Sequence, residues 1–249
     1  MPDNELAGRV AVITGAGRSI GRAMAVELAA AGCAVFVNVR QNRAEAEAVV
    51  KEIEKTGGRG LVAVADVVDA PAVNAMAQAT LEKFGRIDYL VNNAALRQEK
   101  SIEHMTFEDW RHITGVILDG AFHCVKACLE AIKKSDAGSI INIGGLTGAV
   151  GAPDRAHVVT AKAGIAGFTR ALAMELAPHK ITVNTIVPGM LAKPDKPYEI
   201  PSHPIYRPIL GRAAWPQDTA PLARLLLGPG GRYITGQIIN VSGGTYFGT

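Results

Sequence analysis

The sequence lacks the features typical of secreted, membrane-spanning and nucleic-acid-binding proteins. Its 249 residues contain three cysteines, Cys33, Cys124 and Cys128, which are too few for a disulfide framework and fit a reducing cytoplasm. It has no run of about 18 apolar residues, so no membrane span is expected. Residues 1–5 are polar and acidic, which argues against a secretory signal. Lysine and arginine form no block, and a net charge of +3 gives no reason to expect nucleic acid as a partner.

Metal-binding patterns, repeats and linkers are also missing. Cys124 and Cys128 are four residues apart, but no histidine pair completes a site, so we interpret them as core or interface packing. No Ser/Gly linker or low-complexity tract divides the chain. We therefore expect a single domain over residues 1–249, interrupted by an irregular, proline-rich loop within residues 190–215.

What is present is a regular alternation of strand and helix patterns. Each short apolar run is followed by an amphipathic helical stretch, which is typical of a parallel sheet covered by helices on both faces. The sequence thus predicts an α/β, doubly wound fold. The predicted strands are 10–13, 33–39, 61–65, 87–91, 139–143, 181–187 and 233–241. The predicted helices after the first are 43–55, 71–84, 106–134, 161–177 and 217–227.

The stretch 14–21 organises the chain. It joins the first strand to the first helix, and its glycines have a Gly-x-Gly-x-x-x-Gly spacing. Gly15 permits a tight turn, Gly17 keeps bulk away from a pyrophosphate, and Gly21 lets the helix pack closely on the strand. Free N–H groups at the start of the helix then suit a dinucleotide phosphate. An ordinary strand-to-helix turn is the alternative.

The end of the second strand bears on which dinucleotide binds. In such a fold an acidic residue here binds the 2′-hydroxyl of NAD, and a basic one accepts the 2′-phosphate of NADP. The turn carries Arg40 and no Asp or Glu, and Arg18 in the first loop can approach the same phosphate. We therefore favour NADP(H), with NAD(H) as the alternative; both arginines can also be simple surface charges.

These motifs, together with several others in the same order, resemble the short-chain dehydrogenase/reductase family over essentially the whole chain. Stretch 14–21 resembles its Thr-Gly-x-x-x-Gly-x-Gly, with Ser19 in place of the middle glycine. The other matching segments are Asp66-Val67, which would contact the adenine; Asn92-Asn93-Ala94-Ala95; Asn184 to Pro188-Gly189, near the nicotinamide; and 233–244 at the C-terminus, with Ser242 for the usual aspartate.

The resemblance implies a seven-stranded Rossmann-like fold, NAD(P)(H) binding, a small-molecule substrate covered by the 190–215 loop, and assembly into a homotetramer or homodimer. It implies that the cofactor contacts Gly15, Gly17, Arg18, Ser19, Ile20, Gly21, Arg40, Asp66, Val67, Asn93, Ala94, Lys162, Pro188 and Gly189. Together with the absent signal and membrane segments, it favours a cytoplasmic protein.

The catalytic set of that family is largely lost. Its Tyr-x-x-x-Lys corresponds to Val158 and Lys162, so the lysine is kept and the tyrosine is not. The family's serine falls on Gly145 and its asparagine on Ile117, and a threonine that often holds the carboxamide falls, less certainly, on Lys193. Positioned acid–base catalysis is worth roughly 10²–10⁴ in rate, and neither valine nor glycine supplies it.

Other side chains are candidates for the missing proton donor. His157 adjoins the vacant position and can titrate near neutral pH, although neighbouring helix residues point about 100° apart, and a capping or surface histidine is the alternative. Thr147 and Thr160 offer hydroxyls. Tyr198 and Tyr206 belong to the covering loop, and Asp154 and Arg155 precede the helix and can contact substrate or cap it.

Three hypotheses follow from the sequence. The first is an NADP(H)-dependent oxidoreductase whose proton donor is rearranged and comes from His157, Tyr198 or Tyr206; Lys162 and His157 are its candidate catalytic residues. The second is an oxidoreductase whose substrate, such as a protonated imine, needs no strong acid. The third is a catalytically inactive NADP(H)-binding protein that serves as a sensor or scaffold.

Overall fold

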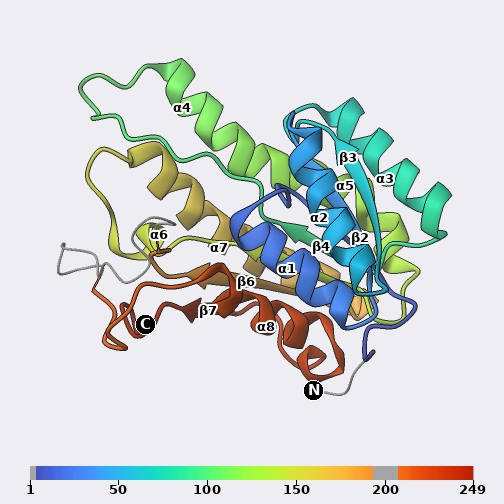
Figure 1. Ribbon diagram of the computed structural model, residues 1–249. Coiled ribbons are helices and arrows are strands. Elements are labelled where there is room, and N and C mark those ends of the chain that lie inside the picture. The colour runs from blue at the N-terminus through green and yellow to red at the C-terminus, as the bar shows by residue number, and fades with distance from the viewer. Residues whose placement is uncertain (1–3, 193–206, 249) are drawn as a thin grey trace.

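The protein is a three-layer α/β structure with the sheet in the middle (Figure 1). The computed structural model describes residues 4–192 and 207–248. Within them, seven parallel strands form one sheet in the order β3-β2-β1-β4-β5-β6-β7, which confirms the predicted fold class. The strands are β1 (Val10–Ile13), β2 (Ala34–Val39), β3 (Arg59–Val64), β4 (Tyr89–Asn92), β5 (Ser139–Ile143), β6 (Thr182–Pro188) and β7 (Ile238–Val241).

Helices connect these strands and cover both faces of the sheet. The α-helices are α1 (Ser19–Ala30), α2 (Arg43–Lys55), α3 (Ala70–Phe84), α4 (Phe107–Thr114), α5 (Gly120–Lys133), α6 (Thr147–Val150), α7 (Ala156–Leu176) and α8 (Pro216–Leu227). A π-helix, η1 (Gly115–Asp119), joins α4 to α5. Two short 3-10 helices are η2 (Ala177–His179) and η4 (Pro229–Gly231).

The two faces of the sheet have separate cores because successive strand residues point to opposite sides. In β1, Ala11 and Ile13 belong to the core beneath α1, α2 and α8. Val12, between them, belongs to the core beneath α3, α5 and α7. Cys124 and Cys128 are fully buried in that second core, which confirms their interpretation as packing residues.

Polar caps start several helices where the sequence places them. Asn42 accepts a hydrogen bond from the amide of Glu45 at the start of α2, and Asp69 accepts one from Ala72 at the start of α3. Thr106 and Asp109 form a capping box at the start of α4.

Three predicted elements differ in the structure. The helix predicted over 106–134 is interrupted by η1, a π-helical insertion that periodicity does not reveal. The helix predicted over 161–177 begins earlier, at Ala156. The strand predicted over 233–241 is confined to Ile238–Val241, because Gly236 has a positive φ of 71° that bends the chain ahead of the strand.

The two ends of the predicted covering loop are hydrogen-bonded to each other. Leu191 and Ala214 form an isolated parallel bridge. Around it, the amide of Ala192 donates to the carbonyl of Ala214 at 2.8 Å, and the amide of Ala214 donates to the carbonyl of Met190 at 2.8 Å. The loop therefore leaves and rejoins the fold at one place, next to the end of β6.

Candidate functional site

A cleft of about 1030 Å³ lies at the carboxyl ends of β1, β2, β4, β5 and β6. The strand order reverses between β1 and β4, and ligands of open parallel sheets bind at such a switch point. Every residue that the resemblance assigns to the cofactor lines this one cleft. The fold thus brings together segments from β1, β2, β3, β4, α7 and β6 that are far apart in the sequence.

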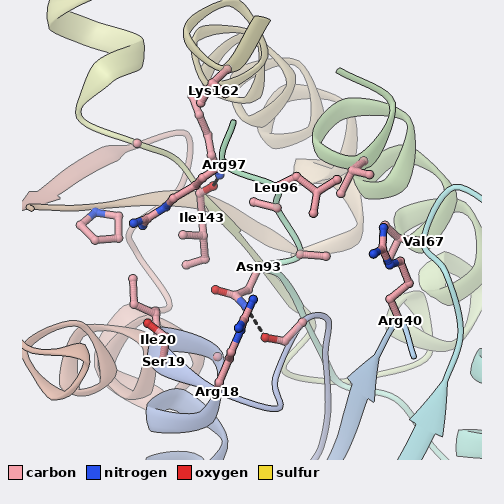
Figure 2. Close-up of a pocket in the computed structure, with 18 of the residues that line it drawn as sticks. Arg18, Ser19, Ile20, Arg40, Val67, Asn93, Leu96, Arg97, Ile143 and Lys162 are labelled. Carbon is pink, nitrogen blue, oxygen red and sulfur yellow. Dashed lines mark hydrogen bonds between the residues drawn. The ribbon is translucent and has the colours of Figure 1, made fainter. Parts of the chain in front are cut away.

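The glycine-rich turn is held against the end of β4. The side chain of Asn93 donates to the carbonyl oxygens of Thr14 and Gly15, each at 2.9 Å. In return, the Thr14 hydroxyl accepts from the amides of Asn93 and Ala94, each at 3.0 Å. Figure 2 shows Asn93 at the centre of the cleft. The amide pair after β4 is therefore a brace for the turn.

The glycines of the turn leave space that side chains would fill. A Cβ on Gly21 would lie 2.5 Å from the carbonyl oxygen of Gly15, and one on Gly17 would lie 2.7 Å from Val39. Arg18, the N-cap of α1, makes no side-chain capping bond, so the first N–H groups of that helix keep their capacity for an anion. These features fit a dinucleotide phosphate.

Ser19 adopts a backbone conformation that favours glycine. Its φ is +51°, in the left-handed region, and the resemblance places a glycine at this position. A non-glycine residue in this conformation is strained.

The end of the cleft beside β2 contains Arg40 and also an acidic residue that the sequence analysis did not single out. Arg40 follows β2 and is drawn beside Val67 in Figure 2, whereas Arg18 extends from the start of α1 toward Asn93. Glu45, on the first turn of α2, also lines the cleft, and a Cβ on Gly17 would lie 3.2 Å from its carboxylate oxygen. The sequence reading considered only the turn after β2 and missed Glu45. Asn42 is recognisable in the sequence as a helix cap, and it places Glu45 in the first turn of α2, beside the cleft.

The opposite end of the cleft contains Lys162. Its Nζ donates to the carbonyl oxygen of Ile143, at the end of β5, at 2.6 Å. Burial, with a smaller contribution from the positive charge of Arg97, lowers the pKa of Lys162 to about 7. An amine with this pKa exchanges protons near neutral pH, which suits acid–base chemistry.

The positions where the resemblance would place the catalytic tyrosine, serine and asparagine are apolar or have no side chain. Val158 lines the cleft and is 7% exposed, and it packs in a cluster with Ile113, Ile117 and Ile165. Gly145 also lines the cleft, and a Cβ there would lie 3.2 Å from Cγ of Lys162. Ile117 belongs to η1 and is buried in the same apolar cluster. These three residues supply no hydroxyl or amide to a substrate.

His157 is fully buried, so its interpretation as a capping or surface histidine is wrong. Its two ring nitrogens have no hydrogen-bond partner among the described residues. It is not among the residues that line the cleft, whereas its neighbours Arg155 and Val158 are. The helical rotation between adjacent residues separates His157 from the site.

Of the remaining candidate proton donors, some line the cleft and others lie outside it. Thr147 lines the cleft, and Thr160 is exposed outside it. Asp154 is exposed, with a positive φ of 57°. Lys193, Tyr198 and Tyr206 lie outside the described residues. Among the residues that the structure describes, no group of three or more metal-ligating side chains occurs, and no helix has the length and apolar character to cross a membrane.

Arg97 is a cleft residue that sequence reasoning missed. It lies in the segment between β4 and α4, and Figure 2 shows its side chain passing Ile143 and the end of Lys162, with the guanidinium pointing away from that lysine. Burial, and then the positive charge of Arg155, lowers the pKa of the Arg97 guanidinium. Arg155 also lines the cleft and is paired with Glu99. The segment after β4 is irregular, so no periodic pattern in the sequence indicates where Arg97 points.

Comparison with known proteins gives consistent relatives over nearly the whole chain. The family model described as enoyl-(acyl carrier protein) reductase matches residues 15–246. A 3-oxoacyl-[acyl-carrier-protein] reductase of Synechocystis is 42% identical over 241 residues, which are 96% of this chain and 97% of that protein. A dehydrogenase/reductase structure from Sinorhizobium meliloti has a TM-score of 0.91 at 34% identity, covering 97% of this chain and 96% of that one. A short-chain dehydrogenase from Burkholderia cenocepacia, solved in complex with NADP, has a TM-score of 0.90 at 31% identity and covers 97% and 99%.

Proposed function

Since this chain belongs to the short-chain dehydrogenase/reductase family, we propose that it is an NADP(H)-dependent oxidoreductase with an atypical active site. It would transfer hydride to or from a small carbonyl, alcohol or imine. The observation that carries the proposal is the single cleft that runs from the glycine-rich turn and Arg40 to Lys162. The proposal treats residues 1–249 as one nucleotide-binding domain, with the 190–215 loop covering the substrate.

The cleft fits a nicotinamide dinucleotide. Gly17 and Gly21 leave room beside the uncapped start of α1 for the pyrophosphate, and Asp66 and Val67 line the place expected for the adenine. Lys162, Pro188 and Gly189 line the end where the nicotinamide half would lie. When bound, the reduced cofactor supplies a hydride to the substrate.

Arg40 favours NADP(H), because a guanidinium at the end of β2 is placed to accept the 2′-phosphate. The Burkholderia relative was solved with NADP. Glu45 makes NAD(H) the second candidate, since its carboxylate lines the same end of the cleft and can accept a hydrogen bond from a ribose hydroxyl.

In this proposal Lys162 moves the proton. During reduction of a carbonyl, the oxygen gains the electron pair of the C=O bond and needs a proton, and the Lys162 ammonium can donate it because its pKa is about 7. The absence of the tyrosine and serine predicts slow turnover of a simple ketone. The absence of these two residues should slow the reduction of an imine less, if the imine is already protonated when it binds.

A catalytically inactive NADP(H)-binding protein is the second candidate function. Val158, Gly145 and Ile117 support it, because they supply no hydroxyl or amide side chain at the three positions where the family has its tyrosine, serine and asparagine. Saturable consumption of NADPH with any carbonyl or imine would contradict it.

Titration calorimetry with NADPH and NADH tests the cofactor assignment. We expect Arg40→Ala to weaken NADPH binding at least tenfold and to leave NADH binding within about twofold, because only NADPH carries the extra phosphate; Arg18→Ala should have a smaller selective effect. Lys51→Ala, an exposed lysine on α2, is the matched control.

Equal loss of both cofactors in Arg40→Ala would contradict phosphate recognition by Arg40. No binding of either nucleotide to the native protein would contradict the proposed function itself and would direct attention to protein partners.

Assembly and location are further parts of the proposal. Phe122 on α5 and Met174 on α7 are exposed apolar side chains, which support a homotetramer or homodimer. We place the protein in the cytoplasm and expect a small-molecule substrate, in line with the family.

A further inference from the structure

The segment between β3 and α3 lines the part of the cleft where the adenine of the cofactor is proposed to lie. Asp66 and Val67 both face this part of the cleft. The amide of Val68 donates to Oδ1 of Asp66 at 3.2 Å. Among the described residues, none donates to Oδ2 of Asp66, so this oxygen keeps its capacity to accept a hydrogen bond from the amino group of a base.

Helix α5 packs against α3 on the same face of the sheet, and its first turn holds Val67 (Figure 1). A Cβ on Gly120 would lie 2.6 Å from Cγ2 of Val67, so this close approach requires a glycine. Three residues later, Nδ1 of His123 lies 3.1 Å from the carbonyl oxygen of Val67. A carbonyl oxygen can accept but not donate, so Nδ1 carries the proton and donates it.

The hydrogen bond from His123 is connected to Asp66 through a single peptide group. The carbonyl of Val67 and the amide of Val68 belong to the same peptide unit, which is planar. His123 binds its carbonyl end, and its amide end binds Oδ1 of Asp66. Fixing the direction of the carbonyl therefore also fixes the direction of the amide that orients the Asp66 carboxylate.

His123 itself lies outside the cleft. Its side chain is half-buried and is not among the groups that line the cofactor cleft. It lines a separate hollow of about 1000 Å³ beside α4 and α5, together with His112 and Phe122. The ring of Phe122 meets that of His123 edge to face, with 5.9 Å between the ring centroids. Any effect of His123 on the cofactor therefore passes through the backbone of residues 66–68.

We propose that His123 is a positioning residue for the adenine: through the Val67–Val68 peptide it directs the carboxylate of Asp66 toward the exocyclic amino group of the base. This inference rests on the proposed function. It assigns recognition of the base to two hydrogen bonds in series, one from α5 to the backbone and one from the backbone to the carboxylate. Without the first bond, the Val67 carbonyl loses its partner and the peptide is free to rotate.

NADPH and deamino-NADPH separate the positioning of the base from the general stability of the fold. In deamino-NADPH hypoxanthine replaces adenine, so an oxygen atom stands in place of the amino group and has no proton to donate to Asp66. Titration calorimetry of the purified protein with each nucleotide measures the preference. We expect the native protein to bind NADPH at least tenfold more tightly than deamino-NADPH.

His123→Phe and His123→Leu both remove the hydrogen-bond donor, so the test stands if one of them does not fold. Each should lower NADPH affinity at least fivefold and change deamino-NADPH affinity less than twofold. His123→Asn, whose side-chain amide can donate to the same carbonyl, should restore most of the NADPH affinity. His112→Leu is the matched control from the same hollow and should bind both nucleotides like the native protein. Melting temperatures show which variants fold.

Three outcomes would overturn the inference. An equal loss of affinity for both nucleotides in the variants without the donor would mean that His123 serves the packing of α5 alone. Native-like NADPH binding by these variants is the second, and equal affinity of the native protein for both nucleotides is the third. If the native protein prefers NADH, then NADH and deamino-NADH make the same comparison. Binding of no nucleotide by the native protein would contradict the proposed function as well, whereas the three outcomes above leave it intact.

Discussion

Lys162 keeps a titratable side chain in a site where its expected partners have become Val158 and Gly145. Its ammonium lies against the carbonyl oxygen of Ile143 and faces the charge of Arg97. The same surroundings that lower its pKa make the charged form costly, so a residue suited to proton transfer is also a source of instability. The proposed role of Lys162 in proton transfer would therefore come at the expense of stability.

Replacing Lys162 by methionine should make the cofactor-free protein more stable at pH 7. The unfolded chain holds the Lys162 proton up to a pKa near 10.5, whereas the folded chain releases it at about 7. Between these values the unfolded state binds more protons, so the stability of the native protein rises with pH from about 7 to about 10.5. Lys162→Met should lose this rise and melt a few degrees higher at pH 7, where each kcal/mol corresponds to about 2–4 °C.

Melting curves from pH 6 to pH 10 for both proteins check this, and Lys51→Met is the exposed control. A lower melting temperature for Lys162→Met at pH 7 would show that the bond to Ile143 outweighs the cost of burying the charge.

At the scale of elements, the β1–α1 turn is hydrogen-bonded to the end of β4 and contains one residue in a strained backbone conformation. Thr14 and Asn93 tie it to the end of β4 through four hydrogen bonds. Ser19 takes a left-handed conformation within it. The brace holds a geometry that serine alone would not adopt.

Ser19→Gly should stabilise the protein by about 1 kcal/mol, because glycine tolerates a positive φ and the left-handed region costs other residues roughly 1–2 kcal/mol. The measurement is the midpoint of urea unfolding with an unchanged slope. Ser19→Ala is the control and should bring no gain, since alanine meets the same steric conflict. A midpoint for Ser19→Gly at or below that of the native protein would show that the Ser19 side chain compensates for the strain.

On the scale of the whole molecule, one edge of the sheet forms the cleft and the opposite edge holds a buried hydrogen-bond network. The carboxyl ends of the strands form the cleft, and the amino ends are joined by the buried carboxylate of Asp88. Asp88 accepts from the amide of Val10 at 2.9 Å, from Nη2 of Arg86 at 2.6 Å and from the Ser135 hydroxyl. It thereby ties β1 to β4 and to the segment before β5.

Asp88→Asn should therefore lower stability by about 3–5 kcal/mol, the usual cost of removing one member of a buried charged network. NADPH affinity should remain within about twofold, because the network lies at the opposite edge of the sheet from the cleft. Asp136→Asn, whose side chain is 74% exposed, should lower stability far less than Asp88→Asn. Denaturant unfolding and calorimetry measure the two effects, and a comparable loss in both variants would contradict a special role for the buried carboxylate.

The sequence by itself determined the fold and identified the residues that line one end of the cleft. Apolar runs such as 10–13 and 139–143 specify buried strands through local patterning, and the glycines at positions 15, 17 and 21 mark a turn that few other residues allow. The prediction that Val158, Gly145 and Ile117 replace catalytic groups also came from the sequence, because these residues occupy fixed positions in motifs that this chain otherwise resembles.

Only the tertiary structure decided where irregular or buried side chains point. Arg97 and Glu45 enter the cleft because of how the β4–α4 segment and the first turn of α2 pack, and His157 is turned into the interior by the placement of α7. The π-helix at Ile117 and the left-handed Ser19 are also absent from any periodic pattern. The physical reason is that local sequence specifies which backbone forms, whereas the direction of a loop side chain and the pKa of Lys162 depend on neighbours that only the folded chain brings together.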